Sequence, residues 1–168
     1  MKHRGAACLY ADVSGYCRLI NADVRSTVRT LTAYRALMTG LVAKHAGRVV
    51  DTAGDSFLAE FGNISRAVRC GLDLQAELSR HNAGLPPSQR VEFRIGIDLG
   101  DVLVHDGRIY GNCVNTAARV QSIAAPGSVC IAASAYERMD AALPVQFEYL
   151  GEHAVRNIDE PLRIYRVE

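Results

Sequence analysis

The stretch Tyr10-Ala11-Asp12-Val13-Ser14-Gly15-Tyr16 decides how the start of this chain folds. Residues 6 to 10, just before and into it, form a short apolar run, and Ser14 with Gly15 interrupts that run. The pattern is typical of a buried strand that leads into a tight turn. Asp12 therefore stands at the end of a predicted strand, where a carboxylate can act in catalysis, although Asp is also favoured in turns for structural reasons alone.

Downstream of this strand, the sequence alternates helical and strand patterns. Apolar residues at near-helical spacing predict a helix over 24–42 that stops at 45–47. A hairpin follows, with strands 48–51 and 57–61 and Asp55 at its tip. A second helix is predicted over 67–78, and a loop over 82–90. Two further strands, 91–99 and 102–105, are predicted on either side of a turn at Gly100 and Asp101.

The last third of the chain gives weaker patterns. They predict a helix over 115–123, a short helix over 134–139, and strands over 127–132, 147–150 and 162–167. The order strand, helix, hairpin, helix, hairpin predicts an α+β fold with a ferredoxin-like βαββαβ core, in which a mostly antiparallel sheet carries helices on one face. We expect residues 1–168 to form a single domain.

Composition restricts the class of protein. The 168 residues are 49% hydrophobic and 22% charged, with a net charge of +1, so nothing predicts a nucleic-acid partner or a charged membrane surface. The five cysteines are scattered without metal-binding spacing, which predicts buried thiols in the reducing cytoplasm. Neither a targeting segment nor an apolar stretch of about 20 residues is present in the sequence.

Asp12 and Asp55 are predicted at neighbouring ends of central strands, within reach of one site. Two carboxylates that share a site suit Mg²⁺ or Mn²⁺, which bind through few protein ligands together with the phosphates of a substrate. Each residue taken alone is equally compatible with a structural turn position. The pair becomes more specific through the motifs around it.

Four motifs occur in order along almost the whole chain, and together they resemble the class III adenylate and guanylate cyclases. They are Tyr10 to Tyr16, Gly54 with Asp55, Phe93 to Ile97 followed by Gly100 to Val102, and Tyr110 to Arg119. The resemblance implies a nucleotidyl cyclase catalytic domain, which turns a nucleoside triphosphate into a 3′,5′-cyclic monophosphate and pyrophosphate. It also implies a head-to-tail homodimer, in which each site takes residues from both subunits.

The resemblance further implies a role for each matched residue. Asp12, Asp55 and the Val13 carbonyl would hold two divalent ions, Mn²⁺ or Mg²⁺, while the turn from Ser14 through Gly15 to Tyr16 would offer amides to phosphates. In-line attack by the ribose 3′-hydroxyl on the α-phosphorus would then expel pyrophosphate without a dedicated protein base.

The remaining matched residues are polar or basic. Asn115 would orient the ribose, and Arg119, four residues later on the same helix face, would stabilise charge that develops on the α-phosphate. Arg94 and Arg156 match positions that grip the β- and γ-phosphates, although the motif around Arg156 is loose. A helix-start Asn and a surface Arg are also common without any such role.

The sequence departs from the family at the two positions that read the base. Adenylate cyclases carry Lys four residues before the second metal aspartate, where this chain has Asp51, and usually Asp or Thr seven residues before the ribose Asn, where it has Arg108. Guanylate cyclases usually have Glu and Cys there. Asp51 can accept an N–H and Arg108 can donate to a carbonyl, which suits uracil, although guanine, cytosine and adenine can also be accommodated.

A compact cyclase with Arg at this position is similar to the bacterial Pycsar pyrimidine cyclases of antiphage defence, whose products act on a separate effector protein. That similarity favours conversion of UTP to cyclic UMP. The alternatives are CTP to cyclic CMP, adenylate or guanylate cyclase activity, and a degenerate module that binds a nucleotide without turnover. Asp51 and Arg108 can also simply pair with each other.

Overall fold

The computed structural model describes residues 1–139, 143–154 and 159–168. In that part of the chain, eight strands form one sheet in the order β2-β3-β1-β4-β6-β8-β7, with β5 paired to β4 outside this path. Of the strand pairs in these residues, only β4 with β6 is parallel, so the sheet is mostly antiparallel, as predicted. The strands are β1 (Lys2–Val13), β2 (Arg48–Asp51), β3 (Phe57–Phe61), β4 (Phe93–His105), β5 (Arg108–Tyr110), β6 (Val129–Ala132), β7 (Phe147–His153) and β8 (Leu162–Val167).

The first four strands confirm the ferredoxin-like core, since β2-β3-β1-β4 is its strand order and every neighbouring pair is antiparallel. The helices are α1 (Tyr16–Ala22), α2 (Val24–Lys44), α3 (Ile64–Ala83), α4 (Asn112–Ile123), α5 (Ala133–Glu137) and the short 3₁₀ turn η1 (Pro87–Gln89). The helix α1 and the 3₁₀ turn were not predicted, and α3 extends into the segment predicted as a loop.

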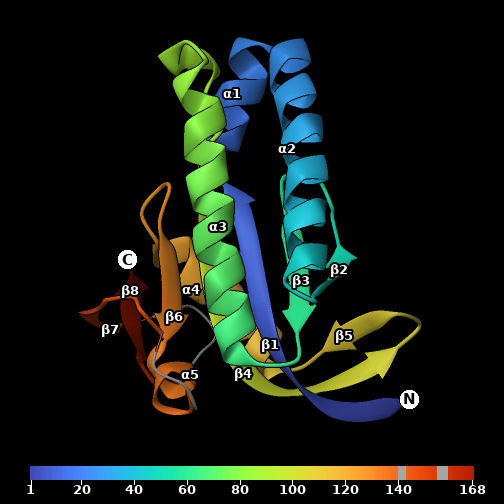
Figure 1. Ribbon diagram of the computed structural model, residues 1–168, viewed down its shortest axis with the longest axis vertical. Helices are drawn as coiled ribbons and strands as arrows, with labels where there is room; N and C mark the ends of the chain where they lie inside the picture. Colours follow the sequence, from blue (N-terminus) through green and yellow to red (C-terminus); the bar gives the residue numbers. More distant parts are fainter. Residues whose placement is uncertain (140–142, 155–158) are drawn as a thin grey trace.

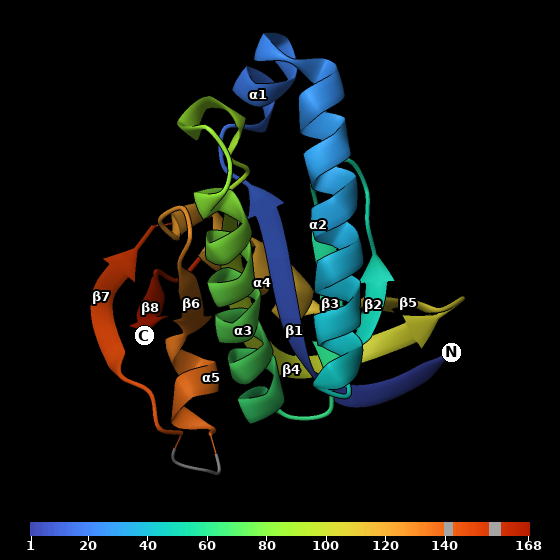
Figure 2. The same ribbon diagram turned by 45° about the horizontal axis from the view of Figure 1, so that its top comes forward.

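Helices cover both faces of the central strands, which corrects the prediction of one covered face. Figures 1 and 2 show α2 and α3 in front of β1, with α4 behind it. The physical reason lies in β1, because its residues on both faces are apolar. Leu9 packs in the core cluster that contains α2 and α3 residues, whereas Cys8 packs with Cys113 and Ala117 of α4. A strand buried on both faces reads as a continuous apolar run.

The two long helices start at side-chain caps. Asp23 accepts a hydrogen bond from the Ser26 amide at the start of α2, and Asn63 accepts one from the Arg66 amide at the start of α3. Each cap satisfies an amide that has no partner inside its own helix. An apolar stripe then holds α2 on the sheet, and its buried members are Leu31, Tyr34, Met38 and Val42.

The strand β4 is continuous, so the predicted turn at Gly100 and Asp101 is wrong. Gly100 instead allows a close approach of α4, because a Cβ there would lie 3.0 Å from the Cβ of Cys113. The hairpin turn comes later, at Asp106 and Gly107, whose φ angles are 50° and 74°. Two consecutive positive φ angles in a two-residue loop favour tight hairpin pairing, here between β4 and the unpredicted strand β5.

All five cysteines are free thiols, and four are buried as predicted. Cys17 is exposed, which corrects the prediction for that residue, because it lies on the outward side of α1. None of the helices described has the length and apolar character to cross a membrane.

Candidate active site

Asp12 and Asp55 come together as predicted. Asp12 is the second-last residue of β1, and Asp55 lies in the loop between β2 and β3, close enough to shift the pKa of the Asp12 carboxyl. Burial, and then Asp55, raise the pKa of the Asp12 carboxyl to about 7, against the Val13 amide and Arg94, which lower it. The fold thus places two carboxylates where two negative charges are unfavourable unless a cation joins them.

The loop that carries Asp55 is fixed to β1. The Tyr10 hydroxyl donates to Ser56 Oγ at 3.1 Å, and the Ser56 amide donates to the Ala53 carbonyl at 2.9 Å, across a turn in which Gly54 has a φ of 58°. Sequence reasoning gave Tyr10 and Ser56 no role. Tyr10 is the first residue of the motif that contains Asp12. A tyrosine near a strand end needs a partner for its hydroxyl, and this could have indicated a contact with the polar loop.

One backbone amide of the turn after Asp12 already has a hydrogen-bond partner within the fold. The Ser14 amide donates to the Glu92 carbonyl at 2.8 Å, which continues the pairing of β1 with the chain before β4. Gly15 adopts a φ of 67° and α1 starts at Tyr16. The Ser14 amide is therefore already used, and Gly15 and Tyr16 are the remaining candidates of the predicted phosphate turn.

Arg94 stands beside the carboxylates. It is the register partner of Asp12, so both side chains leave the same face of the sheet. Its Nη1 is 3.4 Å from the Ser122 carbonyl, and its buried Nε has no hydrogen-bond partner among the described residues. A buried donor without a partner costs free energy unless an acceptor arrives.

Asn115 and Arg119 lie on α4, which packs unusually close to β4. A Cβ at Gly96 would lie 2.3 Å from both the Ala117 carbonyl oxygen and the Gln121 amide nitrogen, so only glycine permits this approach. Asn115 is exposed and Arg119 is half-buried. Within the described part of the chain, no hydrogen bond or ion pair joins either residue to Asp12 or Asp55.

Asp51 and Arg108 approach each other between β2, at the edge of the sheet, and β5. Asp51 Oδ2 lies 4.0 Å from Arg108 Nη1, and both side chains are exposed. The register between β2 and β3 slips between Val49 and Asp51, so Val50 is an extra residue and Asp51 is the partner of Leu58. Such a bulge reorients the side chains that follow it, here toward the face where Leu58 packs with α4 residues.

Arg156 lies outside the described residues, so its predicted contact stays a prediction. In residues 1–139, 143–154 and 159–168, no group of three or more His, Cys, Asp or Glu side chains could hold a metal ion. A pair of carboxylates still fits Mg²⁺ or Mn²⁺, which keep waters and phosphate oxygens as their other ligands.

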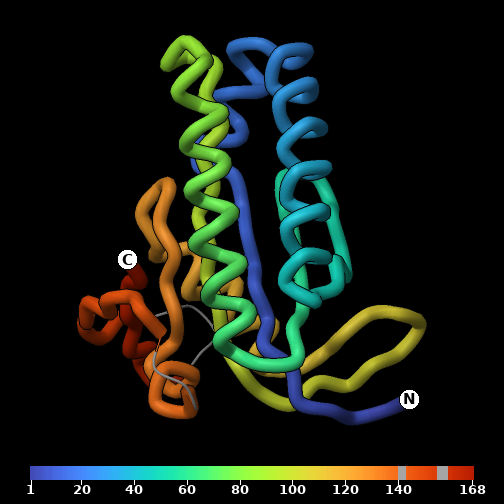
Figure 3. The backbone as a smooth tube through the Cα atoms, viewed as in Figure 1, coloured from blue at the N-terminus to red at the C-terminus, as the bar shows by residue number. Residues whose placement is uncertain are grey.

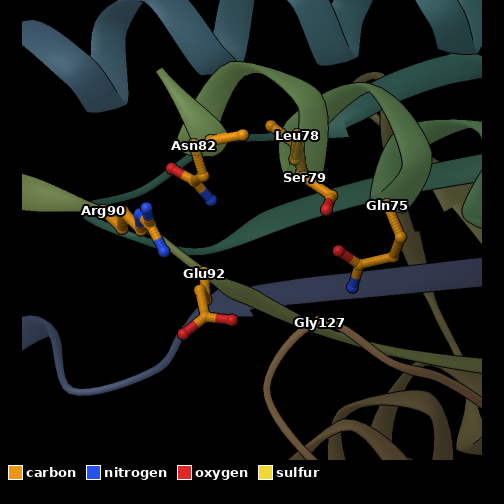
Figure 4. Close-up of a pocket in the computed structure, with 8 residues that line it drawn as sticks. Gln75, Leu78, Ser79, Asn82, Arg90, Glu92 and Gly127 are labelled. Atoms are coloured by element: carbon orange, nitrogen blue, oxygen red, sulfur yellow. The ribbon is translucent and has the colours of Figure 1, made fainter. Parts of the chain in front are cut away.

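A cavity of about 280 Å³ lies elsewhere, between α3 and the start of β4 (Figure 4). It is lined by Gln75, Ser79, Arg90 and Glu92, among others, and by none of the predicted site residues. The Gln75 side chain donates to the Phe93 and Ser128 carbonyls, each at 2.9 Å, and so ties α3 to the sheet. This cavity is separate from the carboxylate pair.

Comparison with known proteins decides the family. The model of the adenylate and guanylate cyclase catalytic domain matches residues 1–168. The chain belongs to this cyclase family. As a cyclase, it is 37% identical over 98% of its length to a protein named putative adenylate cyclase 3 from Rhizobium meliloti (strain 1021), and it spans 28% of that relative. It is 32% identical over 78% of its length to an adenylate cyclase from Streptomyces coelicolor, of which it spans 33%.

Solved structures agree with the cyclase fold. The crystal structure of an adenylate/guanylate cyclase/hydrolase from Silicibacter pomeroyi matches with a TM-score of 0.86 and 34% identity, covering 99% of this chain and 98% of that one. The adenylyl cyclase CyaB from P. aeruginosa matches with a TM-score of 0.83 at 21% identity, over 99% and 95% of the two chains, which supports the fold alone. The predicted cyclase family and fold are confirmed.

Proposed function

We propose that this cyclase converts a nucleoside triphosphate into its 3′,5′-cyclic monophosphate and pyrophosphate, with UTP as the favoured substrate. The observation that carries the reaction is the meeting of Asp12 and Asp55 beside Arg94, in a chain of the cyclase family. The proposal treats residues 1–168 as one catalytic domain, whether or not the natural protein is longer.

Asp12, Asp55 and the Val13 carbonyl would hold two Mg²⁺ or Mn²⁺ ions. When bound, the ions would acidify the ribose 3′-hydroxyl and neutralise the triphosphate. The chain's own residues would position the substrate around them: the Arg94 guanidinium would bind a phosphate oxygen, and the Gly15 and Tyr16 amides at the start of α1 would bind another. Arg156 is proposed to grip the outer phosphates as well.

Asn115 and Arg119 would complete the site from the partner protomer of a head-to-tail homodimer. Both stand on the open side of α4, and neither touches the carboxylate pair of its own chain in the described residues. Asn115 would hold the ribose so that its 3′-hydroxyl faces the α-phosphorus, and Arg119 would stabilise the charge that grows on the α-phosphate. A symmetric dimer then has two equivalent sites.

The choice of base rests on Asp51 and Arg108. An ionised carboxylate accepts the uracil N3–H, and the guanidinium donates to a neighbouring carbonyl. The 4.0 Å separation and the exposure of both side chains support a pair that can open around a base edge. Cytosine lacks the imide N–H, which places CTP second. The product would be cyclic UMP, proposed to act on a separate effector in antiphage defence.

A second candidate is adenylate cyclase activity, which the names of the Rhizobium and Streptomyces relatives favour. One assay separates the candidates: the protein is incubated with ATP, GTP, CTP or UTP and Mn²⁺ or Mg²⁺, and cyclic products are identified by chromatography. Cyclic UMP as the main product is expected. Cyclic AMP or GMP alone would reject the pyrimidine assignment, and no cyclic product from any nucleotide would leave only a nucleotide-binding module.

A further inference from the structure

One guanidinium connects the two strands that carry the base-reading pair. Arg48 is the first residue of β2, and its Nε donates to Glu60 Oε1 on β3 at 2.9 Å. Its Nη1 donates to the Gly107 carbonyl at the β4–β5 turn, also at 2.9 Å. Asp51 follows Arg48 on β2, and Arg108 follows Gly107 at the start of β5. The side chain of Arg48 is therefore a strut between the supports of Asp51 and Arg108.

The inner end of this strut is firmly anchored. Glu60 is only 5% exposed and binds Arg4 of β1 as well as Arg48. The two arginines hold its pKa below the ordinary range against the opposing effect of burial. A buried carboxylate that would be left with an unpaired charge strongly resists separation from its partners. Arg48 is therefore bound to a carboxylate that is held in place on the sheet.

The outer end of the strut contacts the turn of the β4–β5 hairpin. The strand β5 is also held by Ile109, which is 5% exposed and lies in the buried cluster that contains Leu58 and Cys113. The hairpin and the start of β1 project to one side of the molecule, as Figure 3 shows. Within the described ranges, β5 pairs only with β4, and it bears the exposed Arg108. Its two-residue turn fixes the local register, with His105 opposite Arg108, but not the tilt of the hairpin toward β2. The Arg48 bond to Gly107 ties the turn itself to the start of β2.

We propose that Arg48, anchored on Glu60, is a positioning residue that sets the distance between Asp51 and Arg108 and thereby the selectivity for the base. This inference rests on the proposed function, since it requires that Asp51 and Arg108 read the base. A simpler view is that Arg48 is a structural ion-pair partner of Glu60 and nothing more. The two views make different predictions for Arg4.

Arg4 is a matched control, because it binds the same oxygen of Glu60 but, among the residues that the structure describes, forms no hydrogen bond or ion pair with the β4–β5 turn. Arg4→Met therefore removes a Glu60 partner and leaves the Gly107 bond in place. Arg48→Met removes both contacts. Arg48→Lys keeps a positive charge that can pair with Glu60. A single ammonium group cannot also reach the Gly107 carbonyl as the forked guanidinium does, so this variant tests the bond to the turn apart from the ion pair.

The test measures kcat and KM for each of the four nucleotides in the wild type and these three variants. We expect Arg48→Met and Arg48→Lys to raise KM for the preferred nucleotide more than they lower kcat, and to reduce the selectivity ratio about tenfold. Arg4→Met should keep the ratio. Hydrogen exchange at the amides of residues 104–110 should speed up in both Arg48 variants and stay unchanged in Arg4→Met.

The outcomes separate this inference from the proposed function. If the wild type makes no cyclic nucleotide, the proposed function fails, and hydrogen exchange alone then reports whether the strut exists. If Arg108→Ala changes base choice while both Arg48 variants keep the wild-type ratio, the inference is overturned and the proposed function stands. An equal loss of selectivity in Arg4→Met would also overturn it, because the effect would then come from Glu60 alone.

Discussion

Asp12 on β1 and Arg94 on β4 are register partners, so a carboxylate proposed to hold metal stands directly beside a guanidinium proposed to hold phosphate. The pairing of two adjacent central strands fixes this arrangement in the backbone. Arg94 also lowers the pKa of the Asp12 carboxyl, against the larger effect of burial. The antiparallel register of β1 and β4 therefore determines the charge balance of the site.

Loss of either carboxylate should abolish turnover without unfolding the protein. Asp12→Asn and Asp55→Asn are each expected to reduce cyclase activity at least about a hundredfold, because each removes a proposed metal ligand. We also expect Mn²⁺ to raise the melting temperature of the wild type and not that of either variant, since a ligand stabilises only the fold that binds it. Asp101→Asn is the control, because it makes the same change from carboxylate to amide at an exposed position on β4. Metal stabilisation that survives in Asp12→Asn would contradict the assignment.

A shared site should allow two inactive variants to restore each other. Asp12→Asn and Arg119→Ala are each expected to be inactive alone, while an equal mixture forms mixed dimers with one intact site. Random exchange should restore about a quarter of the wild-type rate, since half of the dimers are mixed and each has one of two sites. Mixtures of each single variant with the double variant Asp12→Asn/Arg119→Ala provide the baseline, because no dimer in them has an intact site. No recovery in the mixture, after exchange is shown by native mass spectrometry, would argue against a site built across the dimer.

The close approach of α4 to the sheet should depend on Gly96. Gly96→Ala places a methyl group against the Ala117 carbonyl and the Gln121 amide, so α4 must shift or tilt. Overpacking of this kind costs about 1–3 kcal/mol in the free energy of unfolding, which urea denaturation measures. Cyclase activity should fall further than stability, because Asn115 and Arg119 move with α4. Gly5→Ala is the matched control, because a Cβ at Gly5 would have no neighbouring heavy atom of the described residues within 4 Å.

Asp98 should make the fold less stable as pH rises. Burial raises the pKa of this carboxyl to about 6, from a usual value of 3.8, although the Leu99 amide and the Ser134 hydroxyl oppose the shift. A carboxyl whose pKa is raised by folding stabilises the folded state at low pH, and that contribution is lost as pH rises through about 6.

Asp98→Asn is uncharged at every pH, so its advantage over the wild type should grow by about 2 kcal/mol between pH 4 and pH 8. Urea unfolding of both proteins at the two pH values measures this difference. Asp101→Asn on the same strand should show no such trend, because Asp101 is exposed. An advantage of Asp98→Asn that shrinks with pH would show that the charged form is stabilised in the fold.

The sequence predicted the elements with strong local signals. The alternation of apolar residues and the turn residues predicted the bounds of the β2–β3 hairpin, and the helical spacing with the stop signal predicted most of α2. The continuous strand β4 could not be predicted, because Gly100 resembles a turn residue when the helix that requires it is unknown. The position of α4 behind the sheet was missed for the same reason, since it depends on packing between segments far apart in the chain.

The candidate site was predicted from motifs, and the structure adds its internal supports. The contact between Asp12 and Asp55 follows from the strand order, which the motifs implied. The hydrogen bond from Tyr10 to Ser56, the use of the Ser14 amide by Glu92 and the strut of Arg48 could not be predicted, because each joins residues whose proximity only the folded sheet creates.

The exposure of Asp51 and Arg108 has a consequence for how such enzymes diverge. Surface substitutions away from buried networks usually change stability by less than about 0.5 kcal/mol. If Asp51 and Arg108 select the base, as proposed, two exposed positions determine which cyclic nucleotide is made, and substitutions there cost the fold little stability. The carboxylate pair and Gly96 under α4, in contrast, are constrained. Descendants of one cyclase can acquire a new signal without first acquiring a new architecture.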